Sequence, residues 1–203
     1  MTTQSNKNDC TSVVLVGVGG QGILLASAVV AQAALSVGYD VKTYEIHGMA
    51  QRGGSVVAQV RYGKKVDSPL VPKGEATVLA SLERTEALRY TDYLAPNGLA
   101  VVSDQVIVPV TVSSGAAKYP EIDEEGLRKF FPNLVYVHAI DHAIELGNAR
   151  AANVILLGAL STKLDELNDE AWTNALQKCV KPKFLDLNLK AFALGRELAL
   201  KNA

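Results

Sequence analysis

The side chains with the greatest capacity for chemistry lie in one short segment, residues 47–55, with the sequence His-Gly-Met-Ala-Gln-Arg-Gly-Gly-Ser. His47 could transfer a proton near neutral pH or hydrogen-bond a substrate. The guanidinium of Arg52 could bind a carboxylate or phosphate through two parallel hydrogen bonds, and the glycines beside it let the backbone approach a ligand closely. We therefore predict that His47 and Arg52 are the catalytic residues.

The rest of this segment could position a ligand. Its predicted ligand-contacting residues are Gln51, Gly53, Gly54 and Ser55. Ser55 has no obvious His/Asp partner in the sequence, so we do not expect a triad nucleophile. A structural alternative stays open for His47, which could be a buried, hydrogen-bonded imidazole that orders the loop.

A second glycine-rich bend, residues 17–22, follows the apolar run Val13–Val16 and precedes a helical pattern. Its G-x-G-x-x-G spacing is typical of loops that bring backbone N–H groups and a helix N-terminus to an anion. The predicted contacts to a phosphate or carboxylate come from Gly17, Gly19, Gly20, Gln21 and Gly22. The alternative is a tight strand–helix turn without a ligand, in which Gln21 caps or solvates its own helix end.

Two further groups of residues have competing interpretations. Glu45 lies near the place where a dinucleotide-binding domain has its ribose-binding acid, which supports a nicotinamide- or flavin-nucleotide alternative. The glycine-rich loop after Glu45 argues against it, because a helix is expected there. Asn148, Arg150 and Asn153 begin an apolar helical segment, and we expect them to cap it and to form internal hydrogen bonds.

The periodicity of apolar residues predicts an α/β fold. Strands are expected at about 12–17, 41–46, 55–62, 76–80, 99–103 and 134–139, and helices at about 23–37, 83–94, 121–131, 148–162, 169–180 and 184–202. A turn at 96–98, a short β segment at 105–112 and a helix cap at Asp141 complete the prediction. The architecture expected is three-layered: a mostly parallel twisted sheet, a helix-free glycine loop or hairpin after the second strand, and a helical C-terminus.

The composition excludes several classes of protein. The 203 residues carry a formal net charge of −1, which does not favour a nucleic-acid or anionic-membrane partner. The two cysteines, Cys10 and Cys179, cannot supply the four thiolates of a usual iron–sulfur cluster, and no metal site is predicted. We expect a polar, disordered tail over 1–11, one domain over 12–203, and a cytoplasmic location.

Three motifs together resemble one known family. Residues 17–22 and 47–55, with Gly-Asn-Ala-Arg-Ala-Ala-Asn at 147–153 and Leu-Gly-Ala at 157–159, are similar to the γ-type domain of 2-oxoacid:acceptor oxidoreductases. Within that family, the indolepyruvate:ferredoxin oxidoreductases are the most similar branch. The resemblance covers almost the whole chain, and the loop at 47–55 is its most specific part.

The resemblance implies a subunit that completes the active site of a larger enzyme. In this family, a large partner chain binds thiamine diphosphate and carries iron–sulfur clusters, a 2-oxoacid such as an arylpyruvate loses CO₂, electrons pass to ferredoxin, and coenzyme A takes the acyl group. No G-D-G sequence typical of thiamine binding occurs here. We therefore expect no cofactor to be held by this chain alone, and no activity without the partner.

Two other functions remain as alternatives. One is a self-sufficient NAD(P)- or flavin-nucleotide oxidoreductase, and the other is a docking module without chemistry. In isolation, the chain could form a homodimer, because the apolar helix at 148–162 and the glycine loops would otherwise be left without a partner.

Overall fold

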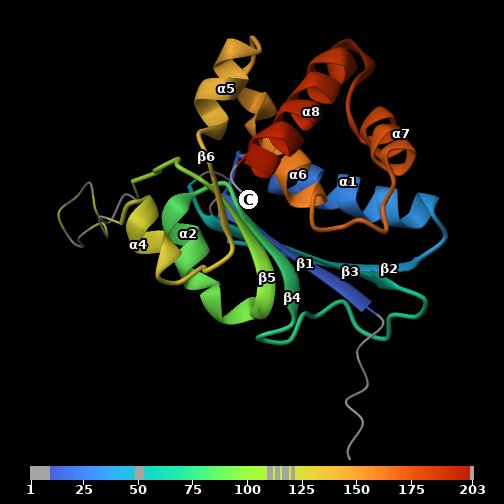
Figure 1. Cartoon of the computed structure of the whole chain (residues 1–203), viewed down its shortest axis with the longest axis horizontal. Helices are drawn as coiled ribbons and strands as arrows, with labels where there is room; N and C mark the ends of the chain where they lie inside the picture. Colours follow the sequence, from blue (N-terminus) through green and yellow to red (C-terminus); the bar gives the residue numbers. More distant parts are fainter. Residues whose placement is uncertain are drawn as a thin grey trace, which may run out of the picture.

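The computed structural model describes residues 10–48, 53–108, 112, 115, 119 and 122–201, and these form a six-stranded sheet between two layers of helices (Figure 1). The strands are β1 (Cys10–Val18), β2 (Asp40–His47), β3 (Ser55–Gly63), β4 (Ala76–Ser81), β5 (Leu94–Ser103) and β6 (Leu134–Val137). Their order in the sheet is β2-β3-β1-β4-β5-β6. β1 begins at Cys10, within the last two residues of the tail expected from the sequence.

The sheet is mostly parallel, as predicted, with one reversed strand. β1, β4, β5 and β6 pair in parallel, whereas β3 lies antiparallel between β1 and β2. Ala58 of β3 stands opposite Leu15 of β1 on one side and Glu45 of β2 on the other. The hairpin expected after the second strand is therefore present, and it inserts β3 between the two strands that precede it in the chain.

Alternating side chains of β1 explain why both faces of the sheet are covered. Val13 and Leu15 join the core beneath α1 (Ile23–Ser36), α6 (Ala152–Ser161), α7 (Asp169–Cys179) and α8 (Leu185–Lys201). Val14 and Val16 join a second core beneath α2 (Arg84–Arg89) and α4 (Glu124–Arg128). Figure 1 shows these two groups of helices on opposite sides of the sheet. The three-layer prediction is thus confirmed.

The apolar segment at 148–162 forms the centre of the helical layer. A 3-10 turn, η2 (Ala149–Ala151), leads into α6, every residue of which is buried. Gly158 of α6 and Gly195 of α8 face each other so closely that a Cβ on either would overlap a backbone carbonyl of the other helix. The two glycines, which lack side chains, therefore allow a close helix crossing inside the domain.

The region after β4 differs from the prediction. The helix expected over 83–94 ends at Arg89 and is followed by a 3-10 turn, η1 (Thr91–Tyr93). The turn predicted at 96–98 instead lies within β5, where the pairing with β4 shifts register. Gly98 packs so tightly there that a Cβ would lie 2.8 Å from the Ala76 carbonyl oxygen. The glycine thus serves a bulge rather than a turn.

Two smaller predictions were also wrong. Residues 104–108 have no regular structure, so the part of the 105–112 segment between 105 and 108 is not a strand; residues 109–111 lie outside the described range. The helix near Asp141 is α5 (Ala139–Glu145), with His138 at the N-cap position and Asp141 in the first turn. A carboxylate in the first turn favours the helix dipole without capping the chain.

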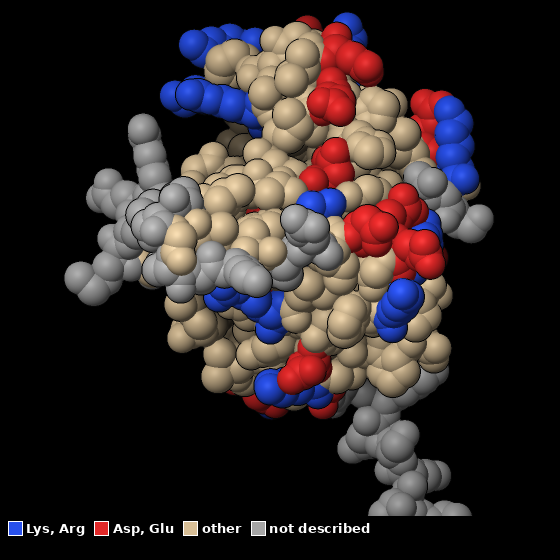
Figure 2. Space-filling view, turned by 90° about the vertical axis from the view of Figure 1, so that its left-hand side faces the viewer, with Lys and Arg blue, Asp and Glu red and all other residues tan. Residues whose placement is uncertain are grey.

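The distribution of charged side chains on the surface agrees with the formal net charge of −1. Acidic and basic side chains both occur across the face shown in Figure 2. Among the described residues, no helix is both long and apolar enough to cross a bilayer. Both cysteines are free thiols, and burial raises the pKa of Cys179, which does not favour a reactive thiolate.

Candidate functional site

The loops at the carboxyl ends of the parallel strands form one continuous edge, which we call the rim: residues 19–22, 53–55, 82–83, 104–105 and 138–141. α1 and α2 leave the neighbouring strands β1 and β4 toward opposite faces of the sheet (Figure 1). In open α/β sheets, a ligand crevice forms where the crossovers diverge in this way. The fold therefore places the first glycine bend at the position most suited to a ligand.

The two glycine bends meet at the rim. The Gly19 N–H donates to the carbonyl oxygen of Gly54 over 2.8 Å. Gly53 has φ +79°, a left-handed conformation that glycine adopts without strain. His47 is the last residue of β2, where it pairs with Val56, and Gln51 and Arg52 lie outside the described residues. The loop that carries the predicted catalytic residues thus starts and ends at the rim.

The side chain of Gln21 joins three parts of the rim. Its Oε1 accepts from the Val18 N–H at 2.6 Å, and its Nε2 donates to the Leu82 carbonyl and to Gln105 Oε1, both at 2.7 Å. The side-chain amide of Gln21 therefore links the end of β1 to the ends of β4 and β5, at the place where α1 and α2 diverge. These contacts make Gln21 a structural connection between loops, a role that the sequence did not indicate.

Other glycines of the first bend allow close packing. Gly20 and Gly22 have φ values of +103° and +85°. A Cβ on Gly22 would overlap Asn153 Nδ2, which donates to the Gly22 carbonyl at 3.1 Å. A Cβ on Gly17 would lie 2.7 Å from Gln21 Oε1. These contacts support a tight turn at Gly17 and Gly22, and contact of the same loop with a ligand stays a prediction.

The predicted ligand contact Ser55 is bound within the protein. Its Oγ donates to Glu86 Oε2 at 2.5 Å, and the Glu86 N–H donates to Glu83 Oε2 at 2.8 Å. Tyr119 donates to Glu83 Oε1, and burial together with this carboxylate raises the pKa of Tyr119 to about 12. Ser55 therefore fixes the second glycine bend to α2.

The position of Glu45 argues against the nucleotide-binding alternative. β3 separates β2 from β1, so Glu45 lies two strands away from the glycine bend that would hold the pyrophosphate. Its Oε1 instead accepts from Ser27 Oγ of α1 at 2.9 Å. A ribose-binding acid is expected on the strand next to the glycine loop. Because β3 lies between β2 and β1, Glu45 is not on that neighbouring strand.

A hollow of about 330 Å³ opens beside the first glycine bend. Its walls include Gly20, Gln21, Gly22, Gln105, Arg150 and Asn153. Within the described chain, no side chain caps the first turn of α1, and Asn153 Oδ1 is buried without a hydrogen-bond partner. The helix N–H donors and the guanidinium suit a ligand with an anionic group, whereas the free amide oxygen of Asn153 can only accept a hydrogen bond and would need a donor.

Sequence reasoning missed Arg150 as a residue of this wall. The expected capping role was confirmed for Asn148, whose Oδ1 accepts from the Arg150 N–H at 3.0 Å. Arg150 itself is exposed beside the glycine bend. Its position depends on the packing of α6 against α1, and no local pattern predicts this contact.

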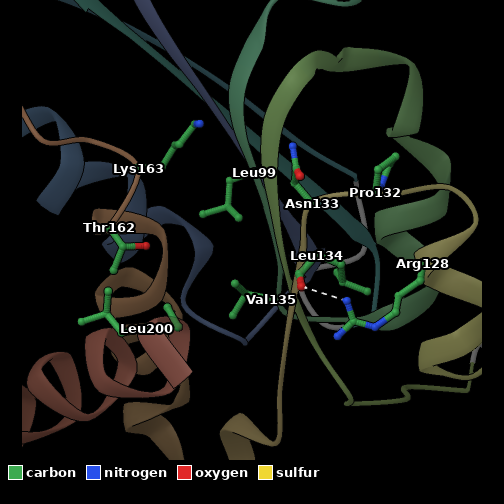
Figure 3. A pocket seen from close by; sticks show the side chains of 10 residues that line it. Leu99, Arg128, Pro132, Asn133, Leu134, Val135, Thr162, Lys163 and Leu200 are labelled. Atoms are coloured by element: carbon green, nitrogen blue, oxygen red, sulfur yellow. Dashed lines mark hydrogen bonds between the residues drawn. The ribbon is translucent and has the colours of Figure 1, made fainter. Parts of the chain in front are cut away.

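A larger hollow, of about 450 Å³, lies at the opposite end of β5 and β6 (Figure 3). Leu99, Val135 and Leu200 line it, and Arg128 donates to the Leu134 carbonyl at 3.4 Å along one side. None of the predicted site residues lies there. Because this second hollow lies at the opposite end of the strands from the rim, Arg128 is a suitable control for variants of rim residues.

The sequence of this chain is similar to known proteins, which shows its family. The sequence matches the family described as pyruvate ferredoxin/flavodoxin oxidoreductase over residues 12–198. The chain belongs to this family. The resemblance drawn from residues 17–22, 47–55 and 147–153 is thereby confirmed, and so is the expectation that the chain is part of an enzyme.

Three known proteins are similar to this chain along nearly their full length. The indolepyruvate oxidoreductase subunit IorB of Archaeoglobus fulgidus is 43% identical over 192 residues, which cover 93% of this chain and 95% of that protein. The IorB subunit of Thermococcus kodakarensis is 43% identical over 194 residues with the same coverage. The crystal structure of a keto/oxoacid ferredoxin oxidoreductase gamma subunit from Geobacter sulfurreducens has a TM-score of 0.69 at 25% identity, covering 94% of this chain and 99% of that one.

We predict that Gln21→Glu lowers the stability of this protein and disorders its rim. The new carboxylate would face the Leu82 carbonyl and Gln105 Oε1, where the wild-type amide donates two hydrogen bonds. Leaving such acceptors unpaired costs roughly 1–3 kcal/mol. Urea unfolding should show this loss at pH 7. Because a protonated carboxyl can donate again and its pKa would be raised in the folded protein, the difference from wild type should shrink as the pH falls toward about 4.3 and stay constant below it. A loss that stays the same at low pH would contradict this role of the Gln21 amide.

Proposed function

We infer that this chain is the small subunit, without iron–sulfur clusters, of a 2-oxoacid:ferredoxin oxidoreductase that acts on an arylpyruvate such as indolepyruvate. The observation that carries this inference is the 43% identity to IorB subunits over 93% of the chain and 95% of the relative. The small subunit must depend on a larger catalytic chain, because two free cysteines cannot hold the clusters that transfer electrons to ferredoxin.

We propose that the cofactors are divided between the chains. Thiamine diphosphate and the iron–sulfur clusters would reside in the large partner, and coenzyme A would enter the assembled complex. When bound in the partner, thiamine diphosphate supplies the carbanion stabilisation needed to release CO₂ from a 2-oxoacid. This chain offers no cluster ligands, but its rim carries the donors suited to an anionic group of substrate or coenzyme.

The two glycine bends provide the proposed contact with the partner's active centre. The hydrogen bond from Gly19 to Gly54 brings both bends to one place, and the hollow with Arg150 opens beside them. In this proposal Gly17, Gly19, Gly20, Gln21 and Gly22 shape one side, and His47, Gln51, Arg52, Gly53, Gly54 and Ser55 form the other. Arg52 binds a carboxylate or phosphate, and His47 hydrogen-bonds substrate or moves a proton.

Several further proposals accompany this assignment. Residues 12–203 would form the single domain of a cytoplasmic subunit, and ferredoxin would dock on the complex rather than on this chain alone. The isolated subunit could pair with a second copy. The inserted strand β3, which displaces Glu45 from the glycine bend, disfavours a self-sufficient nucleotide-dependent enzyme.

An omission experiment tests the proposed function. The large and small subunits are purified separately, and arylpyruvate-dependent reduction of ferredoxin is measured for each chain and for the mixture, with coenzyme A present. We expect the mixture to exceed either chain alone by at least about 10²-fold, because the active centre is complete only in the complex. Full activity of the large subunit alone, or acceptor reduction by this chain alone, would refute the assignment.

A further inference from the structure

Three side chains able to bind a metal ion converge at the end of the rim formed by β5 and β6. Asp104 follows β5, His138 follows β6, and Asp141 lies in the first turn of α5. One ligating atom from each lies within 4.8 Å of the other two. We propose that Asp104, His138 and Asp141 bind a divalent transition-metal ion. The observations behind this proposal are independent of the function assigned above.

The three groups lie close enough to share one ion after small side-chain rotations. With metal–ligand bonds of about 2.1 Å, neighbouring donors in an octahedron lie about 3 Å apart and opposite ones about 4.2 Å apart. His138 Nδ1 is 2.7 Å from Asp104 Oδ2. The side chain of His138 is 61% exposed and Asp141 is also exposed, so both can rotate slightly and water can complete the coordination.

The ligand set indicates which ions would bind. Two carboxylates balance the charge of a divalent cation, and an imidazole favours Co²⁺, Ni²⁺ or Zn²⁺ over Mg²⁺ or Ca²⁺. Sequence spacing could not predict this site, because Asp104 and His138 are 34 residues apart and meet only through the pairing of β5 with β6.

The same helix offers an internal comparison. His142 Nδ1 lies 3.3 Å from Glu145 Oε2, which forms a second histidine–carboxylate pair on α5. Among the described residues, that pair has no third ligand within reach. A simple histidine–carboxylate pair should bind a metal weakly, so the proposal depends on Asp141 as the third ligand.

A metal at this site would lie beside the hollow at the glycine bend. Gln105 follows Asp104, Ile140 lies between the other two ligands, and both residues line that hollow. The cation would therefore add positive charge to the wall of a space already suited to an anionic group.

Cobalt binding to the tag-free chain tests the proposal. Co²⁺ is titrated by visible absorption and Zn²⁺ by calorimetry, with Mg²⁺ as a competitor. We expect one saturable Co²⁺ per chain, insensitive to excess Mg²⁺, and at least a tenfold loss of affinity in both His138→Gln and Asp141→Asn. His142→Gln is the matched control and should bind like wild type.

Three results would overturn the proposal. The first is no saturable binding at one equivalent, and the second is an unchanged affinity in either His138→Gln or Asp141→Asn. The third is an equal loss in His142→Gln, which would indicate adventitious binding to surface imidazoles. Thermal melts of each variant separate lost ligation from lost folding, since the exposed positions of His138 and Asp141 should leave the melting temperature nearly unchanged.

Discussion

Gly158→Ala is expected to destabilise the protein by about 3 kcal/mol or more, because the added Cβ would overlap the Phe192 carbonyl oxygen of α8. Helix propensity alone predicts the opposite sign, since alanine is favoured over glycine by about 1 kcal/mol in a helix. The packing effect should dominate, because backbone atoms of α8 cannot move aside without separating two buried helices. For a chain of this size, the melting temperature should fall by roughly 6–12 °C.

Two further variants separate an effect of helix propensity on stability from an effect of the packing between α6 and α8. Gly195→Ala, on the other side of the same crossing, should have a similar effect, because its Cβ would overlap the Ile155 carbonyl oxygen. Leu200→Ala, which changes a side chain of α8 that is 69% exposed, should alter stability by less than about 0.5 kcal/mol. Higher stability of Gly158→Ala in thermal or urea unfolding would show that the crossing is looser than described.

Arg52→Ala is expected to reduce turnover of the assembled enzyme by about 10²-fold. A guanidinium that stabilises developing charge on a bound carboxylate or phosphate contributes a loss of this order when removed. Arg52→Lys should recover only part of the rate, because lysine cannot form two parallel hydrogen bonds. Substrate titrations of the purified complex separate an effect on kcat from an effect on KM.

The fold was largely predictable because its signals are local. The continuous apolar run of β1, the apolar alternation in β3 and the apolar run of α6 each identify an element without knowledge of its neighbours. The turn predicted at 96–98 was wrong because Gly98 is required by the approach of β5 to Ala76, a contact between different strands. Local sequence patterns identify helices and strands, whereas a β-bulge depends on which strands pair with each other.

The candidate site was predictable only in part. The glycine spacing of residues 17–22 and 47–55 identified both bends, and the Gly19–Gly54 hydrogen bond brings them together. The role of Gln21 was not foreseen, because its partners Leu82 and Gln105 follow strands that come much later in the chain. Arg150 was missed for the same reason, since the packing of α6 brings it to the hollow. Contacts across the sheet edge leave no periodic signal in the sequence.

The most direct measurement of the central claim is turnover of the purified two-subunit complex with Arg52→Ala, compared with Arg128→Ala at the opposite end of β6. If the glycine-rich rim serves the partner's active centre, both variants should assemble with the large subunit as wild type does, and only Arg52→Ala should lose about 10²-fold in kcat. Equal rates for the two variants in fully assembled complexes would contradict the account.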